Sequence, residues 1–375
     1  MILALYALVA AQSIAAAIVL RRLARGRARP RPLRGGTRAA PGSVSIVIPA
    51  RNEALRIGPL LTALQGCGPA VAEVIVVDDR STDATRAVVL AHATANSRLR
   101  LLEGTPLAAG WVGKQHALQQ GLAAAASPWT LCLDADAQPS ADLPDALVLA
   151  AAAHSYEVLT AGPRFALGSA WEEVLHPALL ATLVYRFGPP TLAAAANEHM
   201  IANGQCLLVP TERFRRAGGW QAVASHMTED VALARHLVRT GWRLGMVNAA
   251  DLLAVDMHDS AAEAWREWGR SLALPGVASG REQVIDITTL VLTLALAPWT
   301  VLAALLLGSP LLAIPGAILL TVRFIFHAAL RSAYDDPTAA YWLAPFADGL
   351  AVVRLVVSAV RPNRRWRGRS YPQSR

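Results

Sequence analysis

The stretch Val44-Ser-Ile-Val-Ile-Pro-Ala-Arg-Asn-Glu53 decides the fold, because an apolar run of strand length ends in a polar cluster. Three similar β-rich runs follow at intervals of roughly 25 to 30 residues, with apolar helical stretches such as 57–64 and 83–93 between them. These runs are Val74–Val77, Leu99–Glu103 and Thr130–Leu133. Strands that alternate with helices in this way predict βαβ units and a parallel sheet with both faces covered.

Polar clusters stand at the carboxyl ends of three of these predicted strands, at 49–53, 78–83 and 134–136. Ligands of such sheets bind beyond this edge. Asp and Ser are also common turn residues and helix caps, so one such cluster would be unremarkable. Three clusters on the same edge favour a binding site.

Asp134-Ala-Asp136 and Lys114 predict a site for a diphosphate. Two carboxylates after a buried strand suit Mn²⁺ or Mg²⁺, which take their other oxygens from water and a diphosphate. Gly110-Trp-Val-Gly-Lys114 is a glycine-flexed turn that leads into a predicted helix over 114–126, and a helix N-terminus binds phosphate well. The alternative for Lys114 is a solvated basic residue.

A second polar group lies further along the chain. Asn203–Val209 is predicted to be a turn followed by a strand, and Thr228-Glu-Asp230 begins a predicted helix over 231–239. Thr228 is a possible cap for this helix, with the two acids at its positive end. Alternatively, one carboxylate is the general base of a transfer reaction.

The composition excludes disorder and an ordinary soluble protein. Hydrophobic residues make up 54% of the chain. When glycine is counted in place of tyrosine the fraction rises to about 59%, against the about 45–50% of soluble domains for that set. The basic residues are 34 arginines and one lysine, and we expect no nucleic-acid partner from the net charge of +8. Three scattered cysteines argue against a disulfide framework or a zinc site and fit a reducing compartment.

Uncharged Met1–Leu20 is long enough to span a bilayer, and an arginine-rich segment follows it. We therefore predict an uncleaved anchor with the following chain in the cytoplasm. The apolar runs 284–307 and 311–330 predict a transmembrane hairpin. The segment 339–360 contains Pro345, Asp348 and Arg354, and we expect it to be re-entrant or in-plane, since the basic tail should stay cytoplasmic. The predicted organisation is an anchor (1–20), a basic linker (21–42), a nucleotide-binding domain (43–280), membrane segments (284–360) and a basic tail (361–375).

Six motifs in order resemble the family 2 glycosyltransferases, inverting enzymes of GT-A fold, over about 43–276. The motifs are Pro-x-x-Asn-Glu (49–53), Val-Asp-Asp-x-Ser-x-Asp-x-Thr (77–85), Gly-Trp-x-Gly-Lys (110–114), Asp-Ala-Asp (134–136), Gly-Gly-Trp (218–220) and Glu-Asp-x-x-Leu-x-Arg (229–235, with a glycine at 241). The resemblance implies an α/β, Rossmann-like nucleotide-sugar-binding domain. It also implies site residues: Pro49, Arg51, Glu53 and Asp79 for base and ribose, Lys114 and Asp134 for the diphosphate, Asp134 and Asp136 for the metal, and Asp230 as catalytic base.

Within this family the chain resembles most the glycosyltransferases of carotenoid, hopanoid and ceramide lipids. This resemblance rests on the Gly-Trp-x-Gly-Lys element, the flanking anchors and the tail Trp366-Arg-Gly-Arg-Ser-Tyr371. Processive relatives carry Gln-x-x-Arg-Trp, where this chain has Trp265-Arg-Glu-Trp-Gly-Arg270. This departure favours the addition of one sugar. We expect Glu229, Trp268 and Arg270 on the acceptor side. The role of His258, as a third metal ligand or an ordinary loop residue, stays open.

These features predict a multi-pass enzyme of the cell membrane with a cytoplasmic catalytic domain. It would move one sugar from a nucleotide-sugar donor to a lipid acceptor, with carotenoid-type and hopanoid-type lipids ahead of ceramide. The segment 171–200 is either an in-plane amphipathic helix or a buried helix pair. Alternative functions are transfer to a polyprenyl phosphate, and an inactive nucleotide-sugar-binding membrane scaffold.

Overall fold

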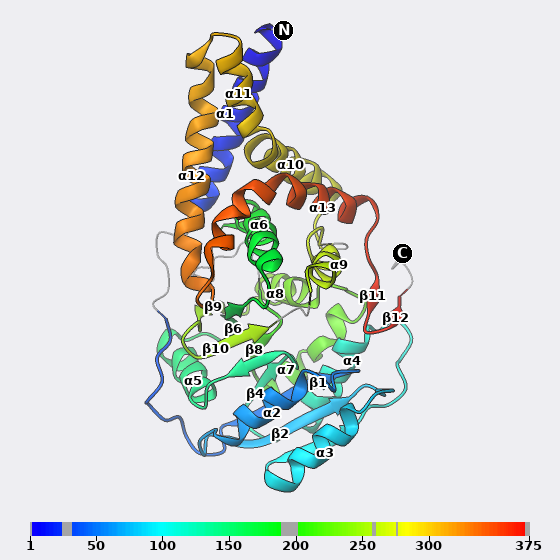
Figure 1. The fold of residues 1–375 in the computed structure, drawn as a ribbon. Helices are drawn as coiled ribbons and strands as arrows, with labels where there is room; N and C mark the ends of the chain where they lie inside the picture. The colour runs from blue at the N-terminus through cyan, green and yellow to red at the C-terminus, as the bar shows by residue number, and fades with distance from the viewer. Residues whose placement is uncertain (1, 25–31, 189–201, 257–259, 275–276, 372–375) are drawn as a thin grey trace. The chain divides into compact units, whose positions relative to one another are not determined.

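The computed structural model describes residues 2–24, 32–188, 202–256, 260–274 and 277–371. The chain forms two compact units. The sheet unit comprises 29–165, 190–256 and 364–375, and the helical unit comprises 1–28, 166–189 and 257–363. The last residues of the chain therefore belong to the sheet unit, although the apolar helices that precede them do not (Figure 1).

The sheet unit is built on a seven-stranded sheet in the order β3-β2-β1-β4-β8-β6-β9. Its strands are β1 (Val44–Ala50), β2 (Val71–Asp78), β3 (Leu99–Glu103), β4 (Trp129–Leu133), β6 (Val158–Gly162), β8 (Cys206–Pro210) and β9 (Leu244–Asn248). Strand β8 is antiparallel to both of its neighbours, whereas the other described pairs are parallel. The prediction of an α/β fold with a mainly parallel sheet is confirmed.

Helices cover this sheet, and β1 is buried along its whole length. The helices of the unit are α2 (Ile57–Gln65), α3 (Thr85–Ala95), α4 (Gly113–Ala124), α5 (Leu143–His154), α7 (Thr211–Arg216) and α8 (Glu229–Arg239). A small sheet in the order β5-β10-β7 and a hairpin of β11 and β12 complete it. Their strands are β5 (Ala137–Pro139), β7 (Arg164–Ala166), β10 (Leu253–Asp256), β11 (Arg365–Trp366) and β12 (Arg369–Ser370).

The helical unit contains apolar helices of membrane-spanning length. Its elements are α1 (Ile2–Ala24), α6 (Ala170–Phe187), α9 (Ala261–Ser271), α10 (Gly280–Leu290), α11 (Ala297–Leu306), α12 (Ile314–Leu330) and α13 (Asp348–Val360). Three stretches of the described residues, 2–24, 310–333 and 339–360, are long and apolar enough to cross a membrane, and a fourth qualifies if α10 and α11 count as one span. Helix α6 is mostly buried, while the rest of the predicted segment up to residue 200 lies outside the described residues.

The first arm of the predicted transmembrane hairpin is broken rather than straight. A π-helical turn at Val291–Ala295 follows α10, and α11 then leaves at a bend of 49°. Pro298 lies in the first turn of α11, where its missing N–H and its ring prevent a continuous helix. The apolar composition of 284–307 predicts one continuous span and does not indicate this break.

Buried ion pairs link helices within the helical unit. The Arg323 guanidinium on α12 makes a bidentate pair with Asp348 on α13, at 2.6 and 2.7 Å. Asp286 on α10 accepts from Arg22 at 2.8 Å and from Arg186 at 3.1 Å. Arg323, Asp348 and Asp286 thus each face a partner of opposite charge, as the cost of burying a lone charge requires.

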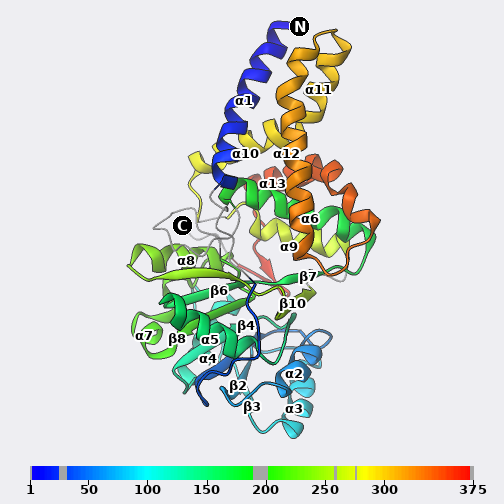
Figure 2. The ribbon, with the colours of Figure 1, turned by 90° about the vertical axis from the view of Figure 1, so that its left-hand side faces the viewer.

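Helix α13 crosses the direction of α1, α11 and α12, which run alongside one another (Figures 1 and 2). Its buried face carries polar side chains, Arg354 and Ser358, whereas its outward face is apolar. The outward side chains are Leu350, Val353, Val357 and Val360, each 42–74% exposed. This distribution suits a helix that lies along a lipid surface, and the in-plane position of this segment stays a prediction.

Close packing of α4 on the sheet generates a stability prediction. A Cβ added at Gly121 would lie 2.2 Å from Cγ1 of Val47 and 3.1 Å from Cγ2 of Val77. Gly121→Ala should therefore lower the free energy of unfolding by about 1–3 kcal/mol, because α4 must move off the sheet. Chemical denaturation of the purified protein measures this change.

Gly58→Ala is the matched control, since Gly58 also lies in a helix but its nearest neighbour would be 3.9 Å away. We expect it to be neutral or mildly stabilising, because alanine favours helix. Equal stability of the two variants would contradict the packing described for α4.

Candidate active site

The carboxyl ends of β1, β2 and β4 bring the three predicted clusters to one edge of the sheet. Pro49 lies near the end of β1, Asp79 directly follows β2 and Asp134 directly follows β4. Neighbouring parallel strands end on the same side, so this edge collects side chains that are far apart in the sequence. The three clusters predicted from the strand pattern therefore lie at the same edge, and their role in binding stays a prediction.

Some residues of these clusters are structural. Asp78 accepts a hydrogen bond from the Ser81 N–H at 3.0 Å, and Asp83 accepts one from the Ala54 N–H at 3.1 Å. Such contacts between a short acidic side chain and nearby backbone stabilise turns. These two aspartates have the turn role, whereas Glu53 and Asp79 make side-chain contacts of a different kind, described below.

Lys114 forms the centre of the site. Its ammonium Nζ lies 2.7 Å from Oδ2 of Asp134 and 2.7 Å from Oε1 of Glu229. Burial alone would lower the pKa of Lys114, but the two carboxylates outweigh it and hold that pKa above its ordinary value. Lys114 is therefore a charged group enclosed by acids, rather than the solvated basic residue of the alternative prediction.

Asp136 is the group here that a cation would suit best. Its Oδ1 is buried and has no hydrogen-bond partner among the described residues. Burial raises the pKa of Asp136 to about 7, and the charges of Asp134 and Glu53 add to the effect. No cluster of three metal-ligating side chains exists among the described residues. The pair Asp134 and Asp136 therefore fits a divalent ion that draws its other ligands from a diphosphate and water.

Asp230 lies in the first turn of helix α8, at the same edge. Its Oδ2 accepts from the Gly204 N–H at 3.1 Å, and its Oδ1 accepts from the Val231 N–H at 2.8 Å. Burial raises the pKa of Asp230 to about 6, with the Glu229 charge adding to it. The Thr228 side chain makes no capping hydrogen bond, so the prediction of a Thr228 cap is wrong, and Asp230 itself bonds the first backbone amide that follows it.

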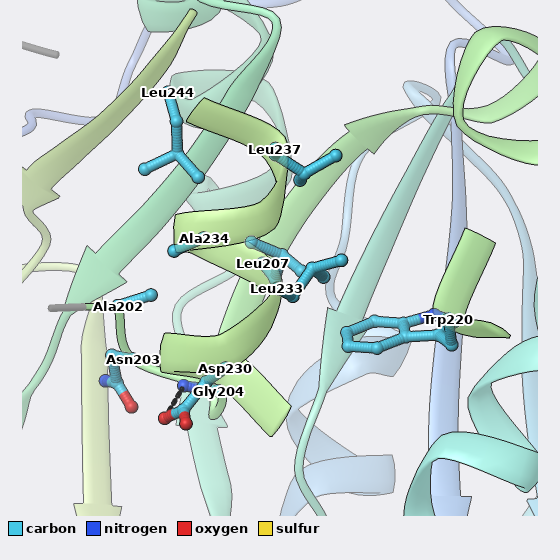
Figure 3. Close-up of a pocket in the computed structure, with 10 residues that line it drawn as sticks. All are labelled: Ala202, Asn203, Gly204, Leu207, Trp220, Asp230, Leu233, Ala234, Leu237 and Leu244. Carbon is cyan, nitrogen blue, oxygen red and sulfur yellow. Dashed lines mark hydrogen bonds between the residues drawn. The ribbon is translucent and has the colours of Figure 1, made fainter. Parts of the chain in front are cut away.

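Asp230 also lines a small, largely apolar pocket (Figure 3). The other lining residues are Ala202, Asn203, Gly204, Leu207, Trp220, Leu233, Ala234, Leu237 and Leu244. Figure 3 shows the Asp230 carboxylate beside Gly204 and Asn203, with the leucine side chains gathered away from it. One carboxylate at an apolar pocket is an arrangement in which a raised pKa is expected.

The Gly-Gly-Trp motif has a backbone role. Gly218 and Gly219 have φ values of +89° and +60°, which favour glycine. A Cβ at Gly219 would lie 2.5 Å from Oε1 of Gln119, and that oxygen accepts from the Trp220 N–H at 2.8 Å. The two glycines thus let the chain turn tightly enough to bring Trp220 into the wall of the pocket.

The three residues expected on the acceptor side are divided between the units. Glu229 lies in the sheet unit and pairs with Lys114. Trp268 and Arg270 lie on α9 of the helical unit, where the Trp268 ring packs against His176 at 5.1 Å between centroids. Their acceptor role stays a prediction. His258 lies outside the described residues.

Sequence reasoning missed the C-terminal hairpin, which was predicted only as a basic tail. Arg367 pairs with Glu53 through Nε and Oε1 at 2.7 Å, and Arg369 pairs with Asp79. The available sequence signal was the glycine at position 368, since glycine favours a tight hairpin turn. In the structure Arg367 and Gly368 have φ values of +41° and +81°, as a two-residue hairpin turn requires. The hairpin thus contacts two residues that the family resemblance assigns to the nucleotide.

Comparison with known families agrees with this geometry. The model of the family "Glycosyl transferase family 2" matches residues 45–209, which include the ends of β1, β2 and β4. Residues 45–209 therefore resemble a glycosyltransferase family 2 domain. The expectation of a glycosyltransferase of GT-A-like fold is confirmed at this level, while Asp230 and Glu229 lie beyond the matched range.

Three known proteins resemble parts or all of the chain. A 4,4'-diaponeurosporenoate glycosyltransferase from Staphylococcus aureus (strain bovine RF122 / ET3-1) is 40% identical over 96 residues, which span 25% of this chain and only 24% of that protein. A mannosyltransferase from Pyrobaculum calidifontis, solved with GDP-Man and Mn²⁺, has a TM-score of 0.56 at 20% identity over 95% of this chain and 99% of its own. A glucosyl-3-phosphoglycerate synthase from Mycobacterium tuberculosis has a TM-score of 0.42 at 19% identity, over 62% and 78% of the two chains.

The buried charge of Lys114 generates a second prediction. Lys114→Met keeps the side-chain length but leaves two enclosed carboxylates unpaired, so we expect a loss in unfolding free energy on the order of 3 kcal/mol. The loss should shrink as the pH falls from 8 to 5, because protonation neutralises enclosed carboxylates that have lost the lysine. Chemical denaturation at both pH values measures this.

Arg86→Met provides the comparison, because the pair of Arg86 with Glu103 at 2.6 Å is 60% and 68% exposed. Exposed pairs contribute at most about 1 kcal/mol. A Lys114→Met variant as stable as Arg86→Met at pH 8 would show that Lys114 is not a structural cation.

Proposed function

We propose that this protein transfers one sugar, with inversion, from a nucleotide-sugar donor to a lipid acceptor in a membrane. The observation that carries the proposal is the convergence of Asp230, Lys114 and the Asp134-Ala-Asp136 pair at one edge of a family 2 domain. A carboxylate with a raised pKa, beside carboxylates suited to a metal and a diphosphate, is what such a transfer needs.

Asp230 is the general base in this mechanism. Hydrogen bonds from the backbone amides of Gly204 and Val231 hold its carboxylate in place. It takes the proton from an acceptor hydroxyl, and the freed oxygen attacks the anomeric carbon from the face opposite the nucleotide. The bond to the diphosphate breaks as the new glycosidic bond forms, so the configuration at the anomeric carbon inverts.

Asp134 and Asp136 hold the divalent ion, which when bound stabilises the negative charge of the departing diphosphate. The Mn²⁺ and GDP-Man of the structurally similar mannosyltransferase support such a cofactor and donor, with Mg²⁺ as the alternative ion. Lys114 lies next to Asp134, where its ammonium adds positive charge beside the leaving group. The base and ribose of the nucleotide bind at the same edge, at Pro49, Arg51, Glu53 and Asp79.

The character of the helical unit supports a lipid acceptor. Its candidate spans and the apolar outward face of α13 favour a membrane enzyme. A polar acceptor would give no reason for this attachment. The match to a diaponeurosporenoate glycosyltransferase supports a carotenoid-type acceptor, with a hopanoid-type lipid as the related choice. In this proposal the sheet unit lies on the cytoplasmic side.

The addition of a single sugar follows from the sequence of α9. Processive relatives carry Gln-x-x-Arg-Trp there, and this chain has Trp265-Arg-Glu-Trp-Gly-Arg270 instead. Transfer to a polyprenyl phosphate is the competing activity, and it needs no general base, because a phosphate oxygen is already ionised. The enclosed carboxylate of Asp230 therefore favours an acceptor that must lose a proton.

The product of the reaction tests this proposal. Membranes that contain the protein, incubated with labelled nucleotide sugars and Mn²⁺ or Mg²⁺, should yield an organic-extractable lipid with one sugar. That product should be stable to mild acid, which cleaves polyprenyl-phosphate sugars. Chromatography and mass spectrometry of the extract identify it.

Matched membranes with the Asp136→Ala variant, and wild-type membranes in EDTA, are the controls, and both should be inactive. Label released by mild acid would favour the polyprenyl-phosphate reaction. Absence of transfer with every donor would favour the inactive scaffold.

The raised pKa of Asp230 generates a further prediction. The base works only when ionised, so kcat/KM should fall as the pH is lowered through about 6, the value to which burial raises its pKa. Asp230→Asn should lower turnover by about 10²- to 10⁴-fold at pH 8, since an amide cannot accept the proton.

Nucleotide binding and unfolding of Asp230→Asn serve as controls, and both should match the wild type. A variant that binds nucleotide normally and turns over at the wild-type rate would exclude Asp230 as the base. Loss of folding would instead assign Asp230 to the support of the turn at Gly204.

A further inference from the structure

The C-terminal hairpin is a defined element of the sheet unit. Strands β11 and β12 pair through Trp366 and Arg369, with Arg367 and Gly368 forming the turn between them. The positive φ values at both turn positions favour a short hairpin. The segment that follows the last apolar helix is therefore folded, and its turn is held in one conformation.

Two arginine side chains of the hairpin bind carboxylates at the edge of the sheet where the nucleotide is predicted to bind. Arg367 binds both oxygens of Glu53, with Nε 2.7 Å from Oε1 and Nη2 3.0 Å from Oε2. Arg369 binds Asp79, a carboxylate in a side chain only 2% exposed. Arg51 donates in turn to the Arg367 carbonyl at 3.2 Å. The two ion pairs join residues that are 314 and 290 positions apart in the chain.

The same hairpin covers the start of α4. The Tyr371 hydroxyl accepts from the Gly113 N–H at 3.1 Å, so it occupies the amide predicted to bind phosphate. A Cβ on Gly113 would lie 2.7 Å from Cζ3 of Trp366 and 3.0 Å from Nη1 of Arg369. Only a glycine allows this approach, and it brings the Arg369 guanidinium to the helix end beside Lys114.

We propose that this hairpin is a wall of the donor site, and that Arg367 and Arg369 bind the diphosphate of the nucleotide donor. The inference rests on the proposed function, because it assumes that the edge binds a nucleoside diphosphate sugar. It adds two binding residues and a folded segment that lie outside the family 2 domain.

The charges around the hairpin give the reason. Arg367 pairs directly with Glu53, and its positive charge also lies within electrostatic range of Asp136, one of the two predicted metal ligands. Guanidinium groups bind phosphate oxygens in a bidentate manner, as they do carboxylates. A bound donor offers hydroxyl and N–H donors to Glu53 and Asp79, and it offers phosphate oxygens to the two arginines. Binding thus exchanges the carboxylate partners of the two arginines for phosphate oxygens, and it leaves each carboxylate hydrogen-bonded to the nucleoside.

Nucleotide binding to the full-length protein tests this inference. Titration calorimetry with UDP and with GDP, each in Mn²⁺, identifies the nucleotide that the wild type binds, and competition with the parent nucleoside measures recognition without phosphate. Arg367→Gln and Arg369→Gln should each weaken diphosphate binding by about 10- to 100-fold. Neither should weaken binding of the nucleoside, and Arg367→Lys should retain part of the diphosphate affinity.

Arg365→Gln is the matched control. Arg365 lies in the same hairpin, but it is exposed and its Nε donates to the Ser370 hydroxyl at 3.3 Å. Its loss should leave both affinities unchanged. Equal loss of diphosphate and nucleoside binding would show that the arginines only support the fold of the edge, and unchanged or tighter diphosphate binding would also overturn the inference. A wild type that binds neither nucleotide would instead refute the proposed function.

Discussion

A single enclosed ammonium group joins the three segments on which the candidate site depends. Lys114 stands in the first turn of α4, Asp134 follows β4 and Glu229 begins α8, and the two carboxylates lie 2.7 Å from the same Nζ. No one of these three charges is stable alone in an enclosed position, because each would lose its hydration without compensation. The mutual pairing therefore requires that helix, strand end and second helix meet in one arrangement. Asp230 and Asp136 are placed by the same arrangement, each within two residues of a carboxylate that pairs with Lys114.

Buried pairs of opposite charge also link apolar helices within the helical unit. Arg323 and Asp348 form a bidentate pair, and Asp286 accepts from two arginines. Ion pairs of this kind add little net stability, since desolvation offsets much of the attraction. Their effect is on specificity, because an apolar helix that slid or rotated would leave a charge without its partner. Packing among leucine and alanine side chains alone would not distinguish such positions as sharply.

The sequence predicted the elements whose signal is local. The alternation of apolar runs with polar clusters sufficed for β1, β2, β3 and β4, and the parallel arrangement then implied that 49–53, 78–83 and 134–136 share an edge. Partners that lie far away in the chain were not predictable in this way. The charge of Arg323 within an apolar segment required a neighbour, but nothing in the local pattern identified Asp348. Arg367 and Arg369 belonged to a predicted basic tail, because their partners Glu53 and Asp79 lie 314 and 290 positions earlier in the chain. The break before α11 was missed because hydropathy does not register the backbone effect of Pro298.

The chemistry of Lys114 has a consequence for covalent labelling. It is the one lysine of this sequence, and arginine does not react with the reagents that acylate amines. Acylation needs the unprotonated amine, whereas the neighbouring carboxylates hold the pKa of Lys114 above its ordinary value and its side chain is only 14% exposed. In the folded protein an amine-directed label therefore bypasses this side chain. A rearrangement that separates Lys114 from Asp134 and Glu229 would expose the one lysine amine of the chain, so acylation at position 114 would report directly on the state of the site.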